Sequence, residues 1–194
     1  MPGAVSCWNC GHTGEQIHFC DSCHSLQPPT TDYFDFFGLP RRFDIDLAEL
    51  ERRFYALSRR LHPDVYFRRS PREQQFSLDA TAILNDACRT LRDPVARAEY
   101  LLSVEGVTVA ESVPPDLIEE VFRFNMAVEE ADPAAMEEIR RGFGAMLDQA
   151  ARELASAGRR YDAAPSPEAL TQIGAVLGKR RFLARLLAQA EKRG

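Results

Sequence analysis

With 194 residues, the chain is long enough for one large domain or two small ones, each with a hydrophobic core. Hydrophobic residues make up 45% of it and charged residues 27%, proportions that exclude wholesale disorder. It has no apolar run near the roughly 18 residues of a membrane-spanning helix, and Cys7 follows the first residue too closely for a signal peptide, so we expect a cytoplasmic protein.

The formal net charge of -5 conceals two segments of opposite sign. Residues 41–69 carry eight arginines against five acids, whereas residues 111–138 hold nine acids and only Arg123 as a base. Such blocks are either solvated helix faces or surfaces that attract a charged partner, and the sequence leaves both interpretations open.

A metal site is the first predicted element, in residues 1–27. Two Cys-x-x-Cys pairs lie close together there, Cys7 with Cys10 and Cys20 with Cys23. Each pair offers two thiolates from one tight turn, and four thiolates complete a tetrahedral shell around Zn²⁺. Disulfides are rare in cytosolic proteins. We therefore predict a structural zinc-knuckle module, with iron as an alternative because it accepts the same four sulfur ligands.

The surroundings of these cysteines limit what the module can do. A thioredoxin-like redox site needs a single Cys-x-x-Cys beside a βαβ pattern, which is missing here. Residues 1–40 contain no Lys or Arg, so the module lacks the charges that bind nucleic-acid phosphates. We expect it to stabilise an appendage or to be a docking surface, and residues 28–31 to be a linker. The nearby histidines are expected at the surface or behind the ligands: His12, His18 and His24.

A long helix is predicted from Asp46 to Leu61, after a short aromatic turn at residues 33–40. Asp46 and Glu49 form a capping-box pattern at its start. Apolar residues then recur every three or four positions, at Leu47, Leu50, Phe54, Leu57 and Leu61. Four arginines lie off this stripe and are expected to form a contiguous, solvent-directed basic face: Arg52, Arg53, Arg59 and Arg60.

The tripeptide His62-Pro63-Asp64 ends this helix, because proline lacks a backbone donor and disfavours the α conformation in the residue before it. A serine, a proline and a glutamate within Ser70–Glu73 signal the start of a second helix, whose apolar stripe continues to Leu91. Cys88 flanks that stripe as a small buried residue and not as a fifth metal ligand.

Two antiparallel helices joined by a His-Pro-Asp turn, with basic residues just before it, resemble the J-domain of DnaJ-type proteins over residues 32–105. The resemblance implies binding to a DnaK-class heat-shock ATPase and stimulation of its ATP hydrolysis. His62, Pro63 and Asp64 would carry the stimulation, and the four arginines would steer the turn toward an acidic surface. The alternatives are a plain helix-stopping loop and an acid–base pair of His62 with Asp64, which lacks a nearby nucleophile.

The residues after the turn resemble one particular subgroup of J-proteins. Ile83–Ala87, Thr90–Pro94 and Arg97–Leu102 look like the HscB subgroup of J-proteins, which serve iron-sulfur cluster assembly. Membership of that subgroup implies two partners, an HscA-type chaperone of the DnaK class and an IscU-like iron-sulfur cluster scaffold protein.

Three further helices are predicted from residue 114 to about 130, from 132 to about 157 and from 166 to about 192, each with proline in its first turn. Short connections between them predict an antiparallel three-helix bundle in residues 114–194, after a connector at 106–113. Glycines inside these helices suggest close packing at Gly142, Gly144, Gly174 and Gly178. The whole chain is thus expected to be all-α: a J-domain helical hairpin, a three-helix bundle and a small zinc-knuckle module.

In the HscB subgroup, the bundle binds the scaffold through an apolar patch with acidic neighbours. Two of the corresponding positions, Phe122 and Asn125, depart from the acids that the subgroup tends to carry, and neighbouring glutamates would have to replace them. For every apolar residue of the patch, a place in the bundle core is the alternative. By position the patch comprises Leu117, Ile118, Val121, Phe122, Asn125 and Phe182.

Together these features predict a co-chaperone with no active site of its own, which delivers a scaffold to its partner ATPase and triggers hydrolysis. Two alternatives remain. A general J-protein with a zinc module would bind unfolded polypeptides broadly, and a zinc-dependent nucleic-acid-binding protein is disfavoured by the acidic net charge.

Overall fold

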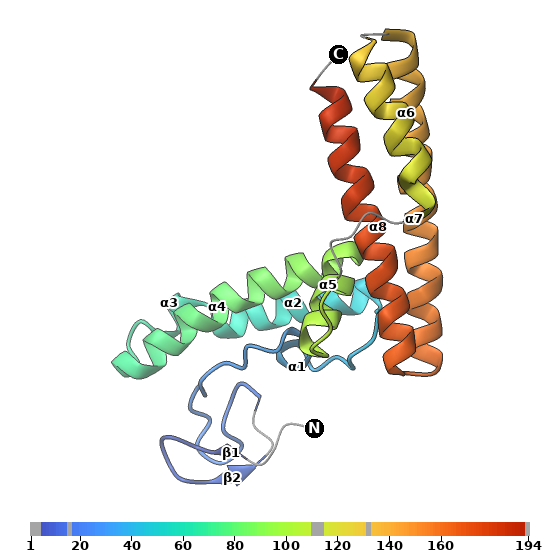
Figure 1. The fold of residues 1–194 in the computed structure, drawn as a ribbon. Helices are drawn as coiled ribbons and strands as arrows, with labels where there is room; N and C mark the ends of the chain where they lie inside the picture. The colour runs from blue at the N-terminus through green and yellow to red at the C-terminus, as the bar shows by residue number, and fades with distance from the viewer. Residues whose placement is uncertain (1–4, 15–16, 110–114, 131–132, 193–194) are drawn as a thin grey trace. The chain divides into compact units, whose positions relative to one another are not determined.

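The computed structural model describes residues 5–14, 17–109, 115–130 and 133–192 (Figure 1). The chain divides into two compact units, residues 1–97 and 98–194. Helices dominate both, so the predicted all-α class, with a helical hairpin and a three-helix bundle, is confirmed. No described helix is long and apolar enough to cross a membrane. The finer domain limits drawn from the sequence remain predictions.

The first unit begins with a short antiparallel sheet, in which Ser6 faces Thr13. Its helices follow in chain order, and a further helix runs across the limit between the units. The elements are β1 (Val5–Ser6), β2 (Thr13–Gly14), α1 (Tyr33–Phe37), α2 (Leu47–Leu61), α3 (Pro63–Tyr66), α4 (Pro71–Arg92) and α5 (Pro94–Val104).

Side chains that accept backbone hydrogen bonds set the helix starts. Asp46 accepts from the amides of Ala48 and Glu49, which begins α2 as predicted. The Glu49 carboxylate does not complete the predicted capping box, because it binds the guanidinium groups of Arg52 and Arg53 instead. At α4 the box is complete: Ser70 and Glu73 each accept from the backbone N–H of the other.

Helices α2 and α4 form the hairpin, and the aromatic helix α1 packs against both. Its rings Phe34, Phe36 and Phe37 are buried. The predicted stripe of α2 faces this core except at Leu47, which is 48% exposed in the first turn. The buried hairpin residues are Leu50, Leu61, Ala80, Leu84, Ala87 and Leu91.

The last carbonyl of α2 is held by side chains of α4. The Ser77 hydroxyl, fully buried, donates to the Leu61 carbonyl oxygen at 2.6 Å, and the Thr81 hydroxyl donates to the same oxygen at 3.3 Å. Helix ends leave such carbonyls without intrahelical partners. These two hydroxyls therefore fix the point at which the chain leaves α2 for the His-Pro-Asp turn.

The second unit holds a short 3-10 turn and three long helices. Helix α7 is six residues longer than predicted, and it packs along α8, while α6 lies against α7 (Figure 1). The predicted close packing is seen at Gly174, where a Cβ atom would lie 3.7 Å from Leu102, but not at Gly142 or Gly144, where it would meet nothing within 4 Å. For Gly178 it stays a prediction. The elements are η1 (Pro115–Leu117), α6 (Ile118–Glu129), α7 (Pro133–Ala163) and α8 (Pro167–Glu191).

Replacing Ser77 by alanine should lower the free energy of unfolding by about 1–2 kcal/mol, because the buried Leu61 carbonyl keeps only the longer bond from Thr81. Urea denaturation followed by circular dichroism measures this loss. Ser103→Ala is the matched control, since that hydroxyl donates to the Tyr100 carbonyl on an exposed surface. Equal losses in the two variants would contradict the role assigned to Ser77.

Candidate metal centre and partner surfaces

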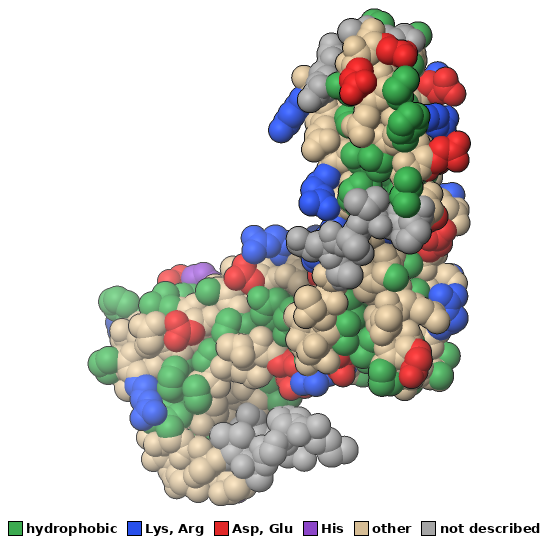
Figure 2. All heavy atoms as spheres, in the orientation of Figure 1, with side chains coloured by type: hydrophobic (Ala, Val, Ile, Leu, Met, Phe, Trp, Pro, Cys, Tyr) green, Lys and Arg blue, Asp and Glu red, His purple; other side chains and the backbone are tan. Residues whose placement is uncertain are grey.

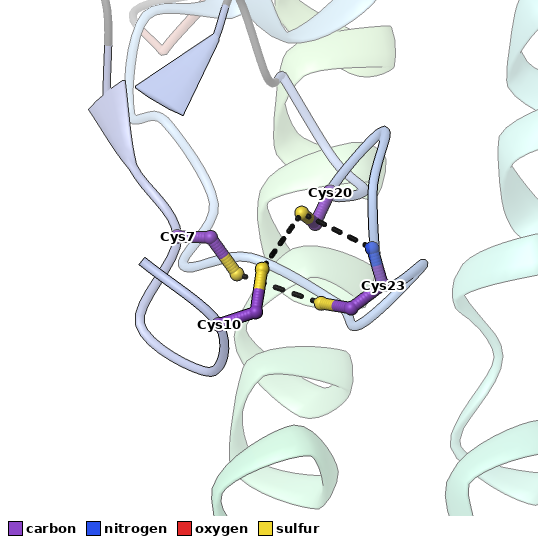
Figure 3. Close-up of side chains that lie close together, drawn as sticks. All are labelled: Cys7, Cys10, Cys20 and Cys23. Atoms are coloured by element: carbon purple, nitrogen blue, oxygen red, sulfur yellow. Dashed lines mark hydrogen bonds between the residues drawn. The ribbon is translucent and has the colours of Figure 1, made fainter. Parts of the chain in front are cut away.

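Four cysteine side chains point toward one another in the N-terminal module (Figure 3). Their sulfur atoms all lie within 4.8 Å of one another, and the Cys7–Cys23 and Cys10–Cys20 sulfur pairs are 3.7 Å apart. A tetrahedron with zinc–sulfur bonds of about 2.3 Å has sulfur–sulfur edges of about 3.8 Å. The four thiols thus fit a single metal ion, as predicted from their spacing.

The two Cys-x-x-Cys turns have the same backbone design. In each, the first cysteine's carbonyl accepts from the amide four residues later, Gly11 or His24, at 2.9 Å. Both of these residues have positive φ, 73° and 58°. Amides inside the turns point at sulfur: Asn9 donates to Cys7, and Cys23 donates to Cys20. His24 thus contributes to its knuckle through its backbone, and the four clustered ligand atoms all come from cysteines.

Polar side chains favour the thiolate form at two of the four sulfurs, those of Cys7 and Cys23. Ser25 and Gln27 are buried, and the Gln27 amide donates to the Cys7 sulfur at 3.4 Å. Burial raises the pKa of Cys7, but hydrogen bonds from the Cys10 amide, the Ser25 hydroxyl and other donors outweigh it and lower this pKa to about 5. Because metals bind the thiolate, these donors suit metal binding. Burial instead raises the pKa of Cys88, which lies outside the cluster.

The cysteine module packs on the hairpin through its aromatic side chains. The Arg72 guanidinium lies 4.8 Å from the Trp8 ring centroid, and Phe76 meets Trp8 edge to face at 6.0 Å. The Arg60 guanidinium lies 4.2 Å from the Phe19 ring. These contacts join the module to the last turn of α2 and the first turns of α4, which are the two helix ends beside the His-Pro-Asp turn.

A hydrogen bond joins the module to α1 as well. His18 Nε2 is 2.8 Å from the Phe36 carbonyl oxygen. Burial lowers the pKa of His18, which favours the neutral ring with the proton on Nε2 as the donor. The module is therefore packed against three helices of its own unit, a contact that no local pattern in the sequence indicates.

The predicted basic face of α2 is not wholly solvent-directed. Arg53 donates to the carbonyls of Phe37 and Gly38 at 2.7 and 2.6 Å, so it holds α1 against α2. Arg60 stacks on the module. Arg52, 66% exposed, and Arg59, also exposed, match the prediction. Tertiary contacts thus engage two of the four arginines.

The His-Pro-Asp turn forms the N-terminus of the short helix α3. His62 caps it, since its Nδ1 accepts from the Asp64 N–H at 3.2 Å. The Asp64 side chain is 90% exposed and that of His62 52% exposed. Val65 and Phe67 beside them are 55% and 78% exposed. The turn therefore presents a carboxylate and apolar groups to solvent.

The six predicted patch residues occupy different depths of the second unit. Ile118 and Phe122 are 61% and 64% exposed on α6, and Asn125 is also exposed. Leu117, in contrast, is 2% exposed and belongs to the core, so its assignment to a surface patch is corrected. Two more patch residues are partly buried against that core: Val121 and Phe182.

Comparison with known proteins finds no family model that matches the chain. The iron-sulfur cluster co-chaperone protein HscB of Mus musculus is 34% identical to it over 181 residues, which are 88% of this chain and 77% of the mouse protein. This chain belongs to the HscB family. The Homo sapiens HscB protein is 34% identical over 178 residues, which cover 86% of this chain and 76% of the human one.

Solved HscB structures agree in fold. The crystal structure of human HscB has a TM-score of 0.75 at 30% identity and covers 97% of this chain and 98% of its own. HscB from Vibrio cholerae has a TM-score of 0.59 at 31% identity, over 83% and 96%. The predicted HscB membership is thus confirmed, and with it the role of a co-chaperone in iron-sulfur cluster assembly.

Removing the metal with a chelator should shift the fluorescence of Trp8 to longer wavelength, because the knuckles that hold this ring against Arg72 and Phe76 depend on the thiolate–metal bonds. The chain contains a single tryptophan, so its emission reports this contact alone. Cys20→Ser should give the same spectrum and bind less metal, whereas Cys88→Ser should change neither. An unchanged Trp8 spectrum after complete metal removal would contradict the coupling.

Proposed function

We propose that this HscB-family protein binds a DnaK/HscA-type heat-shock ATPase through its His-Pro-Asp turn and stimulates ATP hydrolysis there, while its C-terminal bundle delivers an IscU-like iron-sulfur cluster scaffold. The chain supplies no catalytic residue of its own to this reaction. The observation that carries the proposal is the Asp64 carboxylate, 90% exposed on a turn whose backbone is fixed on both sides.

Several hydrogen bonds hold the turn before any partner arrives. The amide of Val65 donates to the His62 carbonyl at 2.9 Å, and the Tyr66 hydroxyl donates to the Arg60 carbonyl at 3.1 Å. The Leu61 carbonyl is held by α4. A rigid turn loses little conformational entropy on binding, and a carboxylate can receive both arms of an arginine. Asp64 thus suits an arginine of the chaperone.

Residues around the turn supply charges that attract an acidic partner and an apolar side chain that adds contact area. Arg52 and Arg59 on α2 are exposed, and charges of this kind raise association rates toward an acidic surface more than they raise affinity. Arg60 adds its positive charge to this surface while its guanidinium stays stacked on the Phe19 ring. Phe67, 78% exposed, gives the surface an aromatic group of the type that dominates binding energy in protein interfaces.

The scaffold surface that we propose consists of Ile118, Phe122 and Asn125, bordered by Val121 and Phe182. Ile118 and Phe122 lie one helical turn apart, so together they expose one apolar strip of α6. Glutamates beside the strip supply the acidic neighbours expected in this family, at Glu119 and Glu129. Leu117 supports the strip from the core.

We propose Zn²⁺ as the resident metal, held by Cys7, Cys10, Cys20 and Cys23. Zinc favours four thiolates in a closed tetrahedral structural site, where it contributes folding energy and no chemistry. None of the five cysteines forms a disulfide in the described part of the chain, which suits a reducing compartment such as the cytoplasm.

Asp64→Asn should abolish stimulation of the chaperone's ATP hydrolysis, because the amide keeps the shape of the turn but loses the charge. Steady-state ATPase assays with a DnaK/HscA-type chaperone measure this. Asp79→Asn, an exposed change on α4, should stimulate like the unmodified protein. Full stimulation by the Asp64 variant, with circular dichroism unchanged, would refute the assignment.

Ile118→Ser combined with Phe122→Ser should weaken scaffold binding at least about tenfold, or about 1.4 kcal/mol, because both exposed side chains lose their apolar contact area. Isothermal titration of the purified scaffold measures the affinity. Leu78→Ser, at an exposed leucine of α4, is the control for loss of surface hydrophobicity and should bind normally. Unchanged affinity in the double variant would place the scaffold elsewhere.

A further inference from the structure

A groove of about 610 Å³ lies between α6 and α7. Phe122 and Met126 line it from α6, and Ala135, Ile139, Gly142 and Met146 line it from α7. Figure 2 shows hydrophobic side chains running over this part of the second unit, with acidic side chains beside them. The α7 wall belongs to neither of the surfaces proposed above.

The groove is open because its α7 wall has no side chain at Gly142. A Cβ atom built there would meet nothing within 4 Å, so close packing does not explain this glycine. Glycine inside a helix costs about 1 kcal/mol relative to alanine. The wall residues of α7 recur at spacings of four, three and four, which places them on one helix face.

The shape of the apolar surface suits a helix as the bound element. Ile118, Phe122 and Met126 are 61%, 64% and 40% exposed at four-residue intervals, so the apolar track continues along α6 for two turns. An elongated track of this kind matches side chains that recur at every third or fourth position of a partner helix. The two methionines, Met126 and Met146, can adapt to such side chains.

Charge selects the kind of helix. The described residues between 116 and 141 include seven acids and three arginines. Three glutamates line the groove, Glu120, Glu130 and Glu138, together with two arginines, Arg123 and Arg141. Glu120 lies 3.9 Å from Arg123. Glu130 and Glu138 are exposed at the rim and have no ion-pair partner among the residues that the structure describes, so the lining keeps a net negative charge. A partner with Lys or Arg beside its apolar face would find carboxylates at the rim.

We infer that this groove binds the apolar face of an amphipathic, basic helix from a partner protein. This site goes beyond the chaperone and scaffold contacts, although it shares Ile118 and Phe122 with the scaffold surface. The helix would place apolar side chains over Gly142 and between the two methionines, with its basic residues against the rim glutamates.

A fluorescent 15-residue peptide tests the inference, with leucine at every third and fourth position, lysine elsewhere and a covalent staple that keeps it helical. Anisotropy titration of the full chain gives its affinity. Gly142→Leu should weaken binding at least tenfold by filling the groove. Gly144→Leu is the matched control: it lies on the same helix, a Cβ atom there also meets nothing within 4 Å, and it does not line the groove. It should bind within twofold of the unmodified protein.

The charge requirement has its own test. A peptide with glutamate in place of lysine should bind at least tenfold more weakly, and 0.5 M salt should reduce that difference. Absence of binding by the lysine peptide, equal losses for Gly142→Leu and Gly144→Leu, or equal affinity for the two peptides would each overturn the inference. Neither chaperone nor scaffold is present in this assay, so its failure leaves the proposed function standing.

Discussion

The bond between the Ser77 hydroxyl and the Leu61 carbonyl is the constraint on which the His-Pro-Asp turn depends. Proline at 63 stops α2 and leaves its last carbonyl without a helical partner, and a buried carbonyl without any partner would cost about 1–3 kcal/mol. Because hydroxyl groups of α4 donate to that carbonyl, the chain leaves α2 at a fixed corner. The same corner directs Asp64 into solvent, so the contact that ends α2 also positions the carboxylate that we propose for chaperone recognition.

The cysteine module belongs to this corner. A segment of this size has little apolar surface to bury, and its four cysteines are placed to hold a metal ion, which can replace a hydrophobic core. Its aromatic rings then stack on Arg60 and Arg72, one from each helix beside the turn. Metal binding, module folding and the end of the hairpin are therefore connected by direct contacts, which explains why the first unit includes the module.

The two units present different kinds of surface. The turn exposes the Asp64 carboxylate, and the helix before it exposes Arg52 and Arg59. Helix α6 instead exposes Ile118, Phe122 and Met126 among acidic residues. Apolar area that stays uncovered in a folded protein favours association. The function that we propose, in which the chain holds one protein while it engages another, would use both surfaces.

The sequence by itself determined whatever depends on neighbouring residues. Spacing of four cysteines indicated a metal site, caps at Asp46 and Ser70 placed the helix starts, and Pro63 placed the stop, because thiol geometry, backbone donors and proline sterics act within a few residues. Only the tertiary structure decided which of several residues of similar type are buried, which are exposed and which make contacts within the fold. It buried Leu117 and exposed Ile118, engaged Arg53 and Arg60 within the fold, and left Gly142 beside a groove. Each of these outcomes depends on which helix lies opposite, and helical periodicity describes one helix at a time.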